Sequence, residues 1–136
     1  MKYKFLDKIT SDVMFEAYGK DMKELLINAA EALMSVVCEI DEVEAKEFVK
    51  FEAEGENEDE LMINWLQSII ALVDTEEMFF KKFEIKEING NSVKATGYGE
   101  PITPKKSGTV VKAVTYYKFQ MEKTKEGLKA TVSLDI

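Results

Sequence analysis

Histidine is absent from this chain of 136 residues, and cysteine occurs once. Without histidine there is no Ser-His or Cys-His nucleophile system, no histidine-ligated zinc and no imidazole general base. A single cysteine, Cys38, also excludes a thiolate zinc site and an internal disulfide, which fits a reducing compartment. Carboxylate, lysine and tyrosine side chains remain for catalysis. Oxygen ligands remain for metals, which favours Ca²⁺, Mg²⁺ or Mn²⁺.

Long apolar runs and an excess of basic residues are also missing. No run reaches the length of a membrane span, and we expect a cytoplasmic protein with no secretory leader and no membrane contact. Lys and Arg total 18 against 26 Asp and Glu, a formal net charge of −8. We expect weak or no direct RNA binding, because phosphate contacts need clustered Lys and Arg. The charge suits a cation ligand or a basic protein partner.

Apolar spacing predicts two amphipathic helices. One begins at Asp21 and the other at Asn57, and each starting residue is followed three positions later by a glutamate, Glu24 or Glu60. This is the spacing of a capping box, in which the first side chain accepts from the third helical N–H. The wide apolar stripes that follow are typical of helices packed on a core.

Period-two alternation predicts strands in the rest of the chain. We place them at 13–18, 42–54, 83–88, 92–98, 111–121 and 128–136. Asn89-Gly90 is a strong hairpin signal, and 100–108 reads as a loop. We therefore expect one α+β domain over residues 1–136. Its architecture would be a two-layer sandwich, with a mostly antiparallel or mixed sheet and both helices on one face.

Acidic residues stand at two predicted strand ends. Asp135 precedes the last residue, Ile136, and Asp12 stands at the entrance of the first long strand. If Ile136 packs in the core, its carboxylate is held beside Asp135, and one further carboxylate would make a hard-cation site. An ordinary last strand with an exposed aspartate explains the same pattern equally well.

Lys112 lies in the least polar stretch of the last β region. A lysine there can simply extend from an edge of the sheet into water. It can also be held near carboxylates or near a phosphate of a partner.

Several short segments together resemble the signatures of a known family. They are Asp12-Val13 with Ala17-Tyr18-Gly19, Tyr98-Gly99-Glu100, Val111-Lys112-Ala113-Val114-Thr115-Tyr116 and Leu134-Asp135-Ile136. In order, spacing and total length the chain is similar to the archease family. The resemblance implies an accessory protein, not an enzyme, for the RtcB-type RNA ligase in tRNA splicing and RNA repair. Such a protein promotes guanylylation of the ligase and so restores multiple turnover.

The resemblance also implies roles for individual residues. Asp12, Asp135 and Ile136 match the family's metal site, and Lys112 matches its functional lysine. Ile9 and Tyr117 stand where the family usually has histidine. These departures weigh against a metal site that uses imidazole and leave an all-oxygen site with Ca²⁺, Mg²⁺ or Mn²⁺ intact. They could also alter contacts with the partner.

Two other functions fit the sequence. One is a chaperone or specificity modulator of a tRNA-modifying enzyme such as a methyltransferase, which a pull-down would reveal. The other is a stand-alone metal-dependent hydrolase built on Asp12 and Asp135, with a carboxylate or Lys112 as general base. Turnover of generic phosphoesters by the purified protein would identify the hydrolase.

Overall fold

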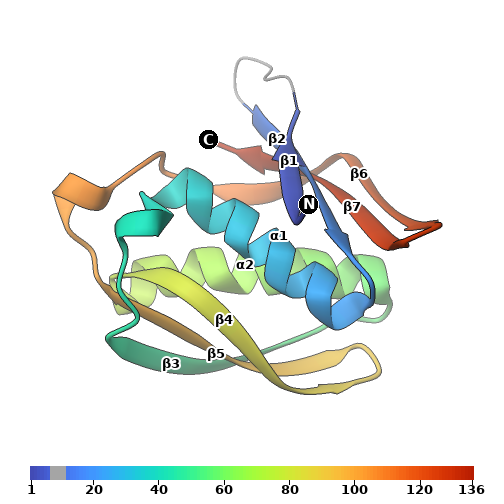
Figure 1. Cartoon of the computed structure of the whole chain (residues 1–136), viewed down its shortest axis with the longest axis horizontal. Coiled ribbons are helices and arrows are strands. Elements are labelled where there is room, and N and C mark those ends of the chain that lie inside the picture. Colours follow the sequence, from blue (N-terminus) through green and yellow to red (C-terminus); the bar gives the residue numbers. More distant parts are fainter. Residues whose placement is uncertain (7–11) are drawn as a thin grey trace.

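The computed structural model describes residues 1–6 and 12–136, within which there are seven strands and two α-helices (Figure 1). In chain order the elements are β1 (Tyr3–Phe5), β2 (Asp12–Gly19), α1 (Met22–Val37), the 3₁₀ turn η1 (Ile40–Glu42), β3 (Glu47–Glu54), α2 (Glu58–Glu76), β4 (Met78–Asn89), β5 (Ser92–Pro101), η2 (Pro104–Lys106), β6 (Ala113–Thr124) and β7 (Gly127–Asp135). Ile9, one of the two residues said above to stand where the family usually has histidine, lies outside the described residues.

The strands form two antiparallel sheets, one in the order β1-β2-β7-β6 and the other in the order β3-β5-β4. Figure 1 shows α1 and α2 between them, and α1 packs on β2 and β4 while α2 packs on β3 and β6. The predicted α+β class, antiparallel pairing and pair of amphipathic helices are confirmed. The expected two-layer arrangement, with one sheet and both helices on one face, is wrong, because the strands divide into two sheets with the helices between them (Figure 1). This division follows from helix stripes wide enough to face apolar surfaces on both sides.

Both helices begin where their capping signatures predict. The Asp21 carboxylate accepts from the Glu24 N–H at 2.9 Å, and the Asn57 side-chain oxygen accepts from the Glu60 N–H at 2.9 Å. The Glu24 carboxylate reaches back to the Lys20 N–H at 3.0 Å. The bonds from the Glu24 and Glu60 N–H groups satisfy backbone donors that the first helical turn leaves without an intrahelical partner.

An aromatic cluster fixes α2 against the smaller sheet. Trp65 is fully buried, its ring centroid lies 5.2 Å from that of Phe51 in a stacked arrangement, and Phe83 meets it edge-on at 6.0 Å. The indole N–H donates to the Leu26 carbonyl of α1 at 2.8 Å. The cluster therefore also ties the two helices together, since a buried indole N–H needs a partner.

Several predicted strand boundaries shift. Residues 42–46 are not part of β3, because η1 and a short connection precede Glu47. β4 begins at Met78 instead of 83, directly after the left-handed residue Glu77 (φ 52°) that ends α2. β6 begins at Ala113, so Lys112 lies one residue before the strand. No helix within residues 1–6 and 12–136 combines the length and apolar character that crossing a membrane requires.

Candidate functional site

The structure places Asp12 directly opposite Asp135. The two residues are partners in the antiparallel β2–β7 ladder, and Ala113 of β6 pairs with Asp135 on the other side. Opposed residues in such a ladder have Cβ atoms roughly 4.5–5.5 Å apart and point to the same face. Their neighbours Val13 and Leu134 are buried in the core. The two carboxylates therefore project from the opposite, outer face, where both are half-buried.

Lys112 and Ile136 lie beside this acidic pair. The Lys112 N–H donates to the Asp135 carbonyl at 2.8 Å, and the lysine side chain is exposed. Ile136 follows Asp135, is half-buried and packs against the core. All four residues singled out in the sequence thus meet at one end of the larger sheet. We call Asp12, Asp135, Ile136 and Lys112 the tip.

A side chain of α2 holds the chain next to Lys112. β6 is an edge strand, and Gln67 supplies an acceptor for its Val114 N–H at 3.0 Å. Gln67 is half-buried within α2. The sequence analysis did not single it out, because a glutamine beside an apolar stripe resembles any solvent-facing helical residue.

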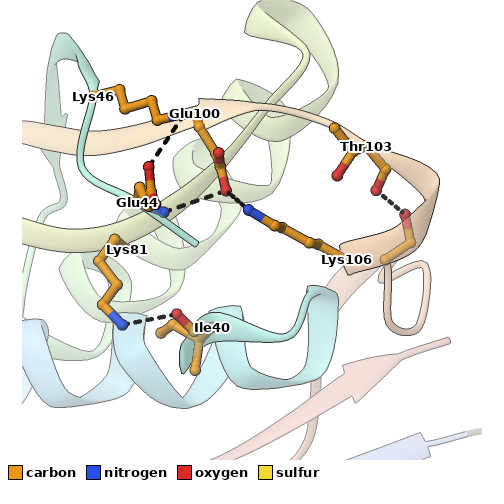
Figure 2. A network of polar contacts seen from close by, with 8 residues as sticks. Ile40, Glu44, Lys46, Lys81, Glu100, Thr103 and Lys106 are labelled. Carbon is orange, nitrogen blue, oxygen red and sulfur yellow. Dashed lines mark hydrogen bonds and ion pairs between the residues drawn. The ribbon is translucent and has the colours of Figure 1, made fainter. Parts of the chain in front are cut away.

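The segment 102–112, which we call the arm, leads from β5 to the tip, and an ion pair anchors it. Lys106 Nζ lies 2.6 Å from the Glu100 carboxylate, and the Glu44 N–H donates to the same oxygen at 3.3 Å (Figure 2). Glu100 is buried, with 6% of its surface exposed. The hydrogen bond from Lys106 holds the pKa of the Glu100 carboxyl below its usual range and raises the pKa of Lys106 in return.

The arm also closes the end of α1. The Gly108 N–H donates to the Val37 carbonyl at 2.9 Å, and the Thr109 N–H donates to the Val36 carbonyl at 2.8 Å. These are carbonyls that a helix leaves open in its last turn. A Cβ on Gly108 would lie 2.5 Å from the Val36 oxygen, so only glycine fits this approach. The loop predicted at 100–108 is therefore tied down along its length.

β6 carries a large bulge that begins four residues after Lys112. Thr115 pairs with Ser133 and Gln120 pairs with Thr131, so the four residues 116–119 oppose one residue of β7. Lys118 has a φ of 53°. The strand predicted over 111–121 is present as β6, but its regular pairing with β7 is interrupted here, because the chain leaves the ladder. Tyr117, which stands where the family usually has histidine, lies within this bulge.

The chemistry of the tip suits a hard cation. Like charges directly opposite each other destabilise a sheet, and no lysine among residues 1–6 and 12–136 forms an ion pair with either aspartate. The donor oxygens fit Ca²⁺, Mg²⁺ or Mn²⁺ and not a soft metal. In the described part of the chain, no group of three or more Asp, Glu, Cys or His side chains is placed to hold a metal. Further oxygens would have to come from Ile136, water or a partner.

Cys38 does not offer an alternative centre. Its thiol is buried with 3% exposure and lies 3.3 Å from the Met34 carbonyl. Burial raises the pKa of the thiol to about 12, so the reactive thiolate is scarce at neutral pH. Cys38 is therefore a buried and unreactive thiol.

Comparison with known proteins gives the family. A model of the archease protein family matches residues 3–136. Protein archease of Archaeoglobus fulgidus is 36% identical over 138 residues, covering 100% of both chains, and that of Methanosarcina acetivorans is 34% identical over 141 residues, covering 99% of this chain and 96% of its own.

Two solved structures share the fold. The solution structure of Methanobacterium thermoautotrophicum protein 1598 superposes with a TM-score of 0.84 at 31% identity, covering 99% of each chain. The crystal structure of a Thermotoga maritima archease, described as a possible chaperone, has a TM-score of 0.71 at 23% identity, covering 96% of this chain and 95% of its own. The chain therefore belongs to the archease protein family.

Proposed function

We propose that this protein is a cytoplasmic accessory protein of an RtcB-type RNA ligase in tRNA splicing and RNA repair. It would promote guanylylation of the ligase and so sustain multiple turnover. Membership of the archease family supports this role. The observation that carries it is the ladder register that sets Asp12 against Asp135, with Lys112 bonded through its backbone to the Asp135 carbonyl.

The tip residues would have different roles, because their side chains differ in charge. Asp12 and Asp135 would hold a divalent cation between two opposed strands, and an oxygen of Ile136 would be a third donor. A bound cation offsets phosphate charge during transfer of a guanylyl group. Lys112 would contribute a compact point charge to a phosphate or to a carboxylate of the partner.

The cation site is open in this proposal. Ca²⁺ takes six to eight oxygen ligands, and the tip supplies two carboxylates and Ile136. The remaining positions are left for water or for groups of the ligase. We therefore expect weak binding by the protein alone, on the order of 10⁻⁴–10⁻³ M for Ca²⁺, and tighter binding in the complex.

A ligase turnover assay with and without this protein tests the proposal. The parent should convert a single-turnover ligase into a multiple-turnover one, and Lys112→Ala should not. Lys105→Ala is a matched control, because Lys105 is also an exposed lysine of the arm. A ligase that turns over equally well without the protein would remove the proposed role. Phosphoester hydrolysis by the protein alone would favour the hydrolase instead.

RNA binding provides a second test of the same role. The net charge of −8 supports poor binding of RNA by the isolated protein at physiological salt. Tight, salt-sensitive binding of tRNA would contradict an accessory role and point to direct action on RNA.

One alternative is a chaperone or specificity modulator of a tRNA-modifying enzyme such as a methyltransferase, and the Thermotoga maritima archease is itself described as a possible chaperone. A pull-down with the tagged protein separates the two. Co-purification of a methyltransferase in place of a ligase would support the alternative.

A further inference from the structure

The β6 bulge, residues 116–119, brings two exposed tyrosines close to the tip. Tyr116 is 72% exposed and Tyr117 is 48% exposed. Val110, on the other side of Lys112, is 78% exposed. Large apolar groups that remain in water at one place mark interaction sites, and tyrosine is enriched where partners bind most tightly.

The bulge has a defined shape. The Ser133 hydroxyl donates to the Tyr117 carbonyl at 2.9 Å, and the Tyr117 N–H donates to the Thr115 hydroxyl at 3.2 Å. Lys118 Nζ lies 5.5 Å from the centre of the Tyr117 ring, within the range of a cation–π contact. A side chain on a fixed backbone loses less conformational freedom when a partner binds it.

The bulge covers the outer face of the sheet beside the acidic pair. Ser133 is fully buried and its ladder partner Met14 is 8% exposed, although both lie on the same outer face as Asp12 and Asp135. The Met14–Ser133 pair and the Asp12–Asp135 pair are two residues apart along each strand, a distance of roughly 7 Å. A surface that contacts the tip would therefore meet Tyr116 and Tyr117 as well.

We propose that Tyr116 and Tyr117 form a docking surface for the protein partner that engages the tip. This inference rests on the proposed function. Exposed Lys112 and Lys118 flank the rings, so the complementary surface is an apolar pocket bordered by acidic or phosphate groups. A protein fits this description better than RNA does, because the chain as a whole carries a charge of −8.

A rival explanation is that the bulge only protects an edge strand. Bulges do prevent edge-to-edge pairing of sheets, but charged side chains serve that purpose and exposed tyrosines do not. The rival predicts that replacing the tyrosines leaves partner binding unchanged and that removing the bulge makes the protein self-associate.

Titration of the full chain into a purified RtcB-type ligase tests the proposal by calorimetry. Tyr116→Ala and Tyr117→Ala should each weaken binding about tenfold or more, with the melting temperature and calcium titration unchanged. Phe48→Ala is the matched control, because Phe48 is 61% exposed and lies on the other sheet. It should bind within about twofold of the parent, since single surface changes away from a contact have small effects.

Ser133→Ala tests whether the shape of the bulge matters, since it keeps both tyrosines and removes the anchor. It should also weaken binding, and affinity equal to the parent's would overturn the role of the anchor. Tyrosine variants that bind like the parent overturn the proposal while the proposed function stands. A parent that does not bind the ligase overturns both. If the parent binds tRNA and the tyrosine variants do not, the partner of this surface is RNA and the proposal is overturned. If the parent forms a dimer and the tyrosine variants do not, the partner is a second copy of the chain, and the proposal is likewise overturned.

Discussion

The two carboxylates that face each other across β2 and β7 should affect stability with opposite signs in the presence and absence of a cation. Without a cation, Asp12 and Asp135 repel each other at directly opposed positions. Asp135→Asn removes one charge at nearly constant shape. The variant should therefore be more stable than the parent in a chelator and less stable than the parent in calcium.

The size of the effect follows from the ladder geometry. The interaction between two directly opposed side chains changes the free energy of unfolding by roughly 0.2–1 kcal/mol. An unfolding entropy of about 2.1 cal/mol/K per residue, over 136 residues, makes 1 kcal/mol equal to about 3–4 °C in Tm. Asp135→Asn should thus raise Tm by about 1–3 °C in EDTA. Calcium at 100 times its Kd stabilises the parent by about 2.7 kcal/mol, or about 9 °C, and most of this shift should vanish in the variant.

Differential scanning calorimetry of the parent and the variant, once in EDTA and once in calcium, measures both changes in Tm. Asp74→Asn is a suitable control, because Asp74 is an exposed acid of α2 and is not part of the β2–β7 ladder. It should keep the full calcium shift. A calcium shift in Asp135→Asn equal to the parent's would refute cation binding by the acidic pair. If the Tm of Asp135→Asn in EDTA is several degrees below that of the parent, the repulsion is refuted, because the Asp135 carboxylate must then make a favourable contact.

Variants at Lys112, Gln67 and Glu100 test the tip and its surroundings. Lys112→Ala should abolish ligase activation and change Tm by less than about 2 °C, as a surface lysine usually contributes little, and Lys112→Arg should restore activation only in part. Gln67→Leu removes the acceptor of the Val114 N–H, so it should cost about 1 kcal/mol and speed hydrogen exchange of that amide, whereas Gln67→Glu should keep its protection. Because the folded protein lowers the pKa of Glu100 from 4.5, its contribution is full above pH 4.5 and is lost as the pH falls through the folded value. Urea unfolding at a series of pH values should show this loss in the parent and a weaker one in Glu100→Gln; equal pH dependence would contradict the role of Lys106.

Features encoded by neighbouring residues were predictable from the sequence. The capping pair at Asp21 and Glu24 forms within four residues, and the Asn89-Gly90 hairpin turns with Gly90 at a φ of 63°. Such signals are read correctly because no distant part of the chain can change them. Alternation likewise predicted strands at 13–18 and 128–136, which lie within one residue of the ends of β2 and β7.

The tip itself depended on more than local pattern. Alternation could show that Asp12 and Asp135 stand at strand ends, and family resemblance could join them, but only the register of two strands separated by most of the chain sets them opposite each other. A shift of one residue would turn one of the carboxylates toward the core. The family resemblance therefore predicted that Asp12 and Asp135 act together, and the β2–β7 ladder shows how they are placed.

Contacts between distant segments were decided only by the tertiary structure. Glu44 and Glu100 are 56 residues apart, and Gln67 and Val114 are 47 apart. Neither pair leaves a periodic mark in the sequence, because each depends on how a helix or loop packs on a sheet. The bulge at 116–119 is of the same kind, since the alternation of its side chains continues while its backbone leaves β7. The sequence by itself therefore determined the elements and their caps, and packing between them determined the two sheets, the fixed arm and the shape of the tip.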